Sequence, residues 1–236
     1  MEQLPIHAAK KFVSKFHPNC DAALLAGSVV SGQATATSDL DIVIFDRNQS
    51  HSYRESLVEF GWPIEVFVHN LDSYKPFFVS DCERARPTLP RMVSEGVILK
   101  DNGIVVDIKN EANELLAKGP EKWSGEIIRL KRYFITDALD DLLGATDRSE
   151  ELQIANTLTE LVSEFVLRTN GHWIGSSKWV MRTLKQFDEQ FAQQYFESFD
   201  LFYRTGDKAD VADLVEDVLR PYGGRLFEGF SIGKNS

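Results

Sequence analysis

The sequence predicts an α+β protein whose first part is a short mixed β-sheet with flanking helices and whose second part is a helical bundle. In the first part, apolar and β-branched runs such as AALLAGSVV, DLDIVIFD and WPIEVFVHN alternate with segments of helical spacing. From Lys122 onward the spacing is helical, interrupted by caps and helix breakers. Gly119 and Pro120 form a stop signal between the two parts. We therefore expect one domain over residues 1–120 and a second over residues 121–236.

The expected elements of the first domain begin with an amphipathic helix that runs to about Phe16. A strand in AALLAGSVV, a polar loop in SGQATATS and a strand in DLDIVIFD follow. We expect a helix in SYRESLVEFG, a strand in WPIEVFVHN and a partly helical, proline-broken segment in FFVSDCERARPTLPRMVSEG. The segment GVILKDNGIVVDI predicts a hairpin that turns at Asn102 and Gly103, and KNEANELLAKGP predicts a closing helix.

The second domain is expected to contain four helices joined by short links. They are EIIRLKRYFITDALDDLLGA, ELQIANTLTELVSEFVLRTNG, KWVMRTLKQFDEQFAQQYFESFDLFYRTG and ADVADLVEDVLRPYGG. The first carries Asp137, Asp140 and Asp141, which either hold a cationic ligand, supply a base or form a solvated helix face.

The composition narrows the class of partner. The 236 residues are 43% hydrophobic, which is enough for a packed core, and carry a formal net charge of -10 with a pI near 5.0. A protein that binds long nucleic acid usually has a basic surface. The negative net charge therefore favours a small partner, and a cationic one would suit it. The N-terminus lacks the apolar core of a signal peptide, and no apolar run is long enough to span a membrane. We therefore expect a cytoplasmic protein.

The most informative pattern is Gly27-Ser28, ten further residues, and then Asp39-Leu40-Asp41 at a strand. Residues at i and i+2 of a strand face the same side, so the two carboxylates converge. Adjacent carboxylates repel each other unless a cation lies between them, and Mg²⁺ prefers such oxygen ligands. Gly27 lets the backbone approach a phosphate closely, and Ser28 adds a hydroxyl donor. The pattern thus predicts a metal site beside a phosphate site.

Glu65 is a candidate third acid. It lies in the middle of the otherwise apolar strand WPIEVFVHN, on the same face as Phe67 and His69. A carboxylate there requires a partner, and a metal ion would supply one; the alternative is a strand-edge residue that faces water. We expect His69 to be a surface residue at the end of the strand.

The stretch GSVVSGQATATSDLDIVIF resembles the signature of the DNA polymerase β-type nucleotidyltransferase superfamily, in which a Gly-Ser turn precedes an Asp-x-Asp strand. Gly32, Ala34, Thr35 and Ser38 are similar to the loop of the smaller members, and Glu65 has the spacing of the family's third acid. The helical second half resembles that of small bacterial antibiotic nucleotidyltransferases, which act on aminoglycosides and lincosamides. Many members have Asp as the third acid, so the longer Glu65 leaves open whether it ligates metal, acts as a base, or both.

The resemblance implies that two Mg²⁺ ions bind at Asp39, Asp41 and Glu65, and that AMP passes from ATP to a hydroxyl of a small acceptor such as an antibiotic. It also implies that Gly27, Ser28 and Ser38 contact the nucleotide, in a cleft between the domains. Transfer to a protein or RNA, or a nucleotide-binding regulatory module without turnover, are the alternatives.

Lys178 is the candidate phosphate-binding residue of the second domain. Ser176 and Ser177 are expected to cap a helix on which Lys178 and Arg182 lie one turn apart. Helix N-termini bind anions, and antibiotic nucleotidyltransferases place a lysine of the second domain on the triphosphate. The alternative is a solvated basic turn beside core tryptophans.

Overall fold

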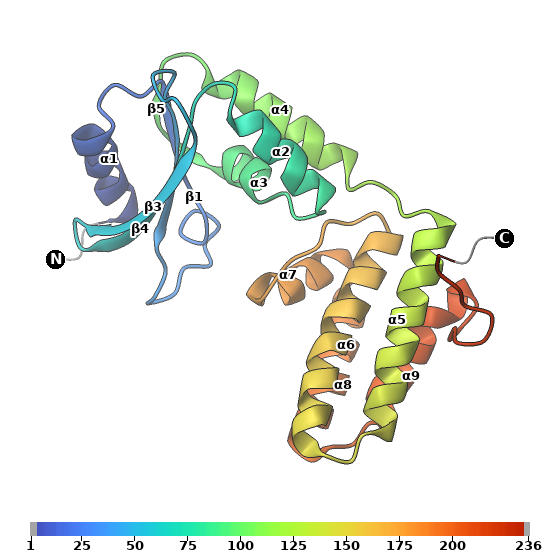
Figure 1. Ribbon diagram of the computed structural model, residues 1–236. Coiled ribbons are helices and arrows are strands. Elements are labelled where there is room, and N and C mark those ends of the chain that lie inside the picture. Colours follow the sequence, from blue (N-terminus) through green and yellow to red (C-terminus); the bar gives the residue numbers. More distant parts are fainter. Residues whose placement is uncertain (1–3, 234–236) are drawn as a thin grey trace. The chain divides into compact units, whose positions relative to one another are not determined.

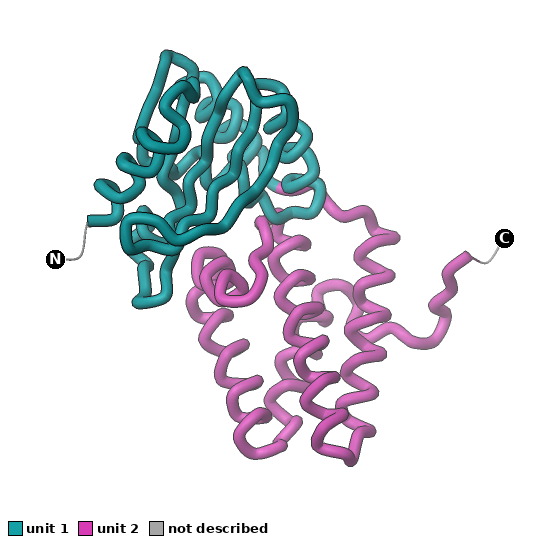
Figure 2. Tube along the Cα trace, turned by 60° about the vertical axis from the view of Figure 1, so that its left-hand side comes forward, with its two compact units in different colours: residues 1–119 teal, residues 120–236 magenta. Residues whose placement is uncertain are grey.

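The computed structural model describes residues 4–233, and the chain divides into two compact units, Met1–Gly119 and Pro120–Ser236 (Figure 2). The first unit combines a β-sheet with helices, and the second is helical. The α+β class predicted from the sequence is therefore confirmed. Within the described residues, no helix combines the length and the apolar character that a membrane span requires.

In the described part of the first unit, five strands form one mixed sheet in the order β3-β4-β2-β1-β5. The strands are β1 (Ala22–Ala26), β2 (Leu40–Phe45), β3 (Tyr53–Glu59), β4 (Trp62–His69) and β5 (Val97–Asp101). β2 and β4 are parallel, whereas the other neighbouring strands are antiparallel. The parallel register places Asp41 directly beside Glu65, although the two residues are far apart in the sequence.

Helices cover both faces of this sheet (Figure 1). On one face, α1 (Pro5–Phe16) buries Ala8, Ala9, Phe12 and Val13 against strand residues that include Ile42, Ile44, Ile64, Val66 and Val68. The other face packs against α2 (Tyr74–Glu83), α3 (Thr88–Glu95) and α4 (Val105–Lys118) through residues that include Val43 and Phe45. Because Asp41 alternates in step with Val43 and Phe45, its side chain belongs to the second face, the one covered by α2, α3 and α4.

The helix expected in SYRESLVEFG is wrong, because this segment forms the edge strand β3. A two-residue loop, Phe60-Gly61, connects it to β4, and both loop residues have positive φ (54° and 80°). Positive φ at both positions is what a tight two-residue hairpin requires. Pairing with β4 thus overrides the helical preference of the isolated segment.

The hairpin expected at Asn102 and Gly103 is also wrong. After β5 the chain enters α4, and the Asp101 carboxylate accepts hydrogen bonds from the backbone N–H groups of Gly103, Ile104 and Val105 at 2.7–3.2 Å. Three donors at the start of α4 are satisfied by one side chain, which favours the helix over a second strand. The helix ends as predicted, at Lys118, with Gly119 in a positive-φ conformation (74°).

The described part of the second unit has five α-helices where four were expected. They are α5 (Gly125–Gly144), α6 (Arg148–Thr169), α7 (Lys178–Phe187), α8 (Glu189–Thr205) and α9 (Ala209–Leu219), followed by the 3-10 turn η1 (Arg220–Tyr222). The long third segment is interrupted at Asp188, where the backbone is extended. The Asp188 carboxylate caps α8 by accepting a hydrogen bond from the N–H of Phe191 (3.0 Å). Asp188 is therefore a helix start inside a run that has continuous helical spacing.

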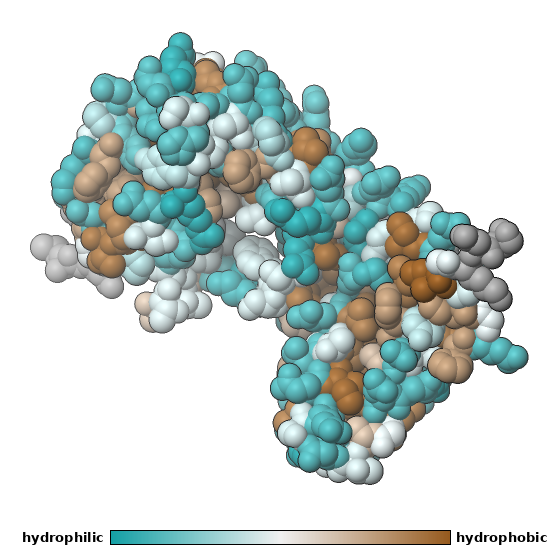
Figure 3. Space-filling view, viewed as in Figure 1, coloured by the Kyte–Doolittle hydropathy of each residue, from teal (hydrophilic) through white to brown (hydrophobic). Residues whose placement is uncertain are grey.

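The C-terminal segment that follows η1 packs against α5. Arg132 donates to the carbonyl of Gly224, the N–H of Leu226 donates to Thr136, and the rings of Tyr133 and Phe230 stack at 3.9 Å. Apolar residues gather at the surface of this unit near the end of the chain (Figure 3). The segment thus adds to the bundle while leaving Phe227 and Ile232 exposed, at 70% and 73%.

Candidate active site

The structure brings the three predicted acids together. Asp39, Asp41 and Glu65 each offer one carboxylate oxygen, and these oxygens all lie within 4.8 Å of one another. Asp39 directly precedes β2, Asp41 lies on β2, and Glu65 is its neighbour on β4. Each of the three is half-buried. Like charges about 4 Å apart near a protein surface repel by roughly 4 kcal/mol. This cluster therefore favours a cation, and hard oxygen ligands at this spacing fit a divalent ion such as Mg²⁺.

Gly27 makes room for the cluster. It follows β1 with φ +78°, and a Cβ placed on it would lie 1.9 Å from Oδ2 of Asp41. Ala26, the residue before it, is paired with Asp41 across the β1–β2 ladder. Only glycine combines this backbone conformation with the space that the Asp41 carboxylate occupies. Both the turn after β1 and the position of the Asp41 carboxylate therefore require glycine at position 27.

Ser28 and Ser38 close the loop between β1 and β2. The Ser28 hydroxyl donates to Oγ of Ser38 (3.0 Å), which also accepts from the N–H of Thr35 (2.8 Å). Both serines are buried. The N–H of Gln33 donates to the Ser28 carbonyl (2.9 Å), which folds the loop back on itself. Ser28 and Ser38, two of the residues predicted to contact the nucleotide, are therefore neighbours, and their side chains hold the loop that leads into Asp39.

Glu65 already has partners on the edge strand β3, which the sequence did not indicate. Nη2 of Arg54 lies 2.5 Å from Oε2 of Glu65, and the Ser56 hydroxyl lies 3.5 Å from Oε1. The Arg54 guanidinium also lies 4.9 Å from the centre of the Phe67 ring. The expectation that a carboxylate at this position needs a partner is thus met in part by Arg54, and metal binding by Glu65 stays a prediction. Arg54 was missed because its segment was expected to be a helix.

His69 is buried, contrary to the expectation of a surface residue. Its exposed fraction is 4%, and Nδ1 lies 3.0 Å from the Ser52 hydroxyl. Burial lowers the pKa of His69 to about 4, so the ring is neutral near pH 7. The Ser52 hydroxyl also donates to Ser73 (2.7 Å). His69 belongs to a packed polar network at the far end of β4 from the acids.

In the second unit, Lys178 is exposed and is the first residue of α7. Ser177 occupies the N-cap position with φ 51°, but its side chain makes no capping hydrogen bond. The expected serine cap is therefore wrong in its chemistry. The Arg182 guanidinium lies 4.6 Å from the centre of the Trp179 ring, so Arg182 packs against the helix surface.

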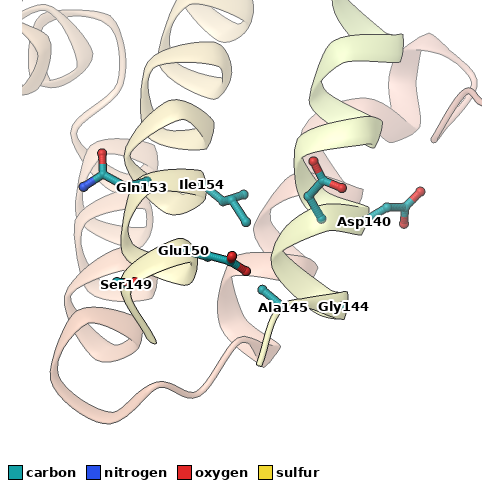
Figure 4. A pocket seen from close by; sticks show the side chains of 8 residues that line it. Asp140, Gly144, Ala145, Ser149, Glu150, Gln153 and Ile154 are labelled. Atoms are coloured by element: carbon teal, nitrogen blue, oxygen red, sulfur yellow. The ribbon is translucent and has the colours of Figure 1, made fainter. Parts of the chain in front are cut away.

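Two of the acidic residues of α5, Asp140 and Asp141, lie at the border of an open hollow within the helical unit. Asp140, Asp141 and Glu150 border an open hollow of about 740 Å³ between the end of α5 and the start of α6 (Figure 4). Asp140 forms an ion pair with Arg225. This pairing neutralises part of the acidic patch and favours the interpretation as a solvated helix face.

Comparison with known proteins finds a distant similarity to solved structures. No protein-family model matches the chain, and no curated protein matches it. Among solved structures, a nucleotidyltransferase-like protein from Exiguobacterium sibiricum 255-15 is similar with a TM-score of 0.47 and 11% identity. The match covers 92% of this chain and 74% of that chain. A likeness at this level carries no conclusion about activity or substrate.

Proposed function

We propose that the chain is a nucleotidyltransferase, and that Asp39, Asp41 and Glu65 form its divalent metal site. The observation that carries this proposal is the convergence of three carboxylates within 4.8 Å of one another, at the start of β2 and on the neighbouring strand β4, next to a glycine whose missing side chain leaves their space open. Bound Mg²⁺ ions would stabilise negative charge on the attacking and leaving oxygens.

The proposed reaction joins an acceptor hydroxyl oxygen to the α-phosphorus of a nucleoside triphosphate. The bond between the α-phosphorus and the bridging oxygen of the β-phosphate breaks, and pyrophosphate leaves with that electron pair. Glu65 either takes the acceptor proton or serves as a metal ligand while solvent takes the proton. Gly27 and Ser28 would approach the phosphates through the backbone, and Lys178 would contact them through its ammonium group.

For the substrates, we propose ATP as donor and a small, cationic acceptor of the aminoglycoside kind. The net charge of -10 supports this choice over a nucleic acid. Acidic residues on the outside of the chain would favour the approach of a cation, whereas a polyanion would be repelled.

The test is transfer of label from an α-labelled nucleoside triphosphate in the presence of Mg²⁺. The purified chain is incubated with each of the four triphosphates and with panels of aminoglycosides and lincosamides, and pyrophosphate release is measured in parallel. We expect label on a small acceptor for the wild type and none for Asp41→Asn. Label that travels with protein or RNA would show a macromolecular acceptor. Nucleotide binding without release of pyrophosphate from the triphosphate in the presence of any acceptor would contradict the transferase assignment.

A further inference from the structure

The ion pair between Arg54 and Glu65 lies directly beside the proposed metal site, on the same face of the sheet. In the β3–β4 register Ser56 lies opposite Glu65 and Arg54 lies opposite Phe67, so Arg54 and Ser56 share the face of the sheet that carries the acids. Glu65 is thus flanked by Asp41 on one side and by a cationic side chain on the other. The Arg54 side chain is 58% exposed, and that of Glu65 is 25% exposed.

We infer that Arg54 is the resident counter-ion of the acid cluster and competes with the incoming divalent cation for Glu65. This inference rests on the proposed metal site. Three clustered carboxylates repel one another, and the Arg54 guanidinium offsets that repulsion when no metal is bound. A metal ion bound by Glu65 would lie close to the positive charge of Arg54, because Arg54 pairs with the same carboxylate. Arg54 therefore stabilises the metal-free site and weakens the binding of the metal by itself.

The Phe67 ring makes Arg54 a positioning residue instead of a mobile surface charge. The guanidinium stacks over this ring while it donates to Glu65, and Ser56 approaches the other carboxylate oxygen. A planar guanidinium held in this way fixes the orientation of the carboxylate. Glu65 is accordingly held beside the two aspartates before any metal arrives.

The chain offers a matched control in the ion pair between Lys15 and Glu59. Lys15 is 55% exposed and Glu59 is 29% exposed, their charged atoms lie 3.3 Å apart, and the Lys15 ammonium lies 5.5 Å from the Phe60 ring. Lys15 lies on α1, which covers the opposite face of the sheet from the acids. Replacing Lys15 removes the same charge from the same unit without touching the acid cluster.

The experiment measures Mn²⁺ binding by electron paramagnetic resonance of the free ion, with wild type, Arg54→Gln, Arg54→Lys, Lys15→Gln and Asp39→Asn. We expect Arg54→Gln to bind Mn²⁺ about three- to tenfold more tightly than the wild type, since one competing charge is removed. Lys15→Gln should stay within about twofold of the wild type. Arg54→Lys, which keeps the charge but loses the planar guanidinium, should bind Mn²⁺ with an affinity between those of the wild type and Arg54→Gln. In the metal-free state Arg54→Gln should melt at a lower temperature than Lys15→Gln, and saturating Mn²⁺ should close that gap.

Two results overturn the inference, and they are distinguishable. If wild type binds Mn²⁺, Asp39→Asn weakens it and Arg54→Gln binds no more tightly than wild type, the metal site stands and the role of Arg54 is wrong. If wild type and Asp39→Asn bind Mn²⁺ equally, or neither binds it, the proposed metal site is wrong and the competition falls with it.

Discussion

Replacing Gly27 with alanine is expected to have two effects, a loss of folding stability from the strained backbone and a loss of metal affinity. The φ of +78° costs an alanine about 1–2 kcal/mol of folding stability. The new Cβ would also lie 1.9 Å from Oδ2 of Asp41, far inside van der Waals contact. Because the clash is with the end of a side chain, rotation of Asp41 relieves it cheaply, but that rotation takes the carboxylate out of the cluster.

Loss of one charged ligand group is worth about 1.5–3 kcal/mol, so Gly27→Ala should weaken Mn²⁺ binding by about 10- to 100-fold. The control is Gly32→Ala in the same loop, where φ is +71° and no atom lies within 4 Å of the added Cβ. Both variants should lose similar stability in urea unfolding, whereas only Gly27→Ala should lose metal affinity. Equal Mn²⁺ affinities of the two variants would refute the assigned role of Gly27.

Four further predictions concern single residues. Asp39→Asn or Asp41→Asn should abolish Mg²⁺-dependent pyrophosphate release while circular dichroism shows an intact fold; near-normal release by either variant would contradict the site. Glu65→Gln should lower the single-turnover rate by about 10²–10⁴-fold if Glu65 is the base, with modest loss of triphosphate binding. Poor binding with a normal rate at saturation would instead make it a metal ligand. Lys178→Ala should weaken the binding of a non-hydrolysable triphosphate by about 1.5–3 kcal/mol in calorimetry, and an unchanged affinity would return Lys178 to the solvated surface. His69 has a pKa of about 4 in the folded chain against an ordinary value of 6.5. The unfolded chain therefore binds more protons between these values, and the free energy of unfolding decreases as the pH is lowered through this range. Between pH 7 and pH 5 the free energy of unfolding in urea should fall by about 2 kcal/mol more for the wild type than for His69→Gln.

The acid pair could be predicted because the two-residue period of a strand is a local property. Asp39 and Asp41 needed only the observation that DLDIVIF is a strand. The place of Glu65 beside Asp41 depends on the parallel pairing of β2 with β4, which is a property of the whole sheet. Here the resemblance to a known family supplied what local periodicity could not.

The error over residues 53–59 shows what a single sequence leaves ambiguous. Tyr53, Leu57 and Phe60 have the i, i+4, i+7 spacing of a helix, and Gly61 would suit a helix C-terminus as well as a hairpin. Pairing with β4 decides between them, and it also brings Arg54 to Glu65. The error in secondary structure and the missed partner of Glu65 therefore have one cause.

The most direct test of the metal site is a crystal of the chain grown with Mn²⁺ and a non-hydrolysable nucleoside triphosphate. Anomalous diffraction locates Mn²⁺ without any knowledge of the acceptor. We predict an anomalous peak enclosed by the carboxylates of Asp39, Asp41 and Glu65, with the triphosphate next to Gly27 and Ser28. Bound triphosphate with its Mn²⁺ at another place, and no peak at the three acids, would contradict it.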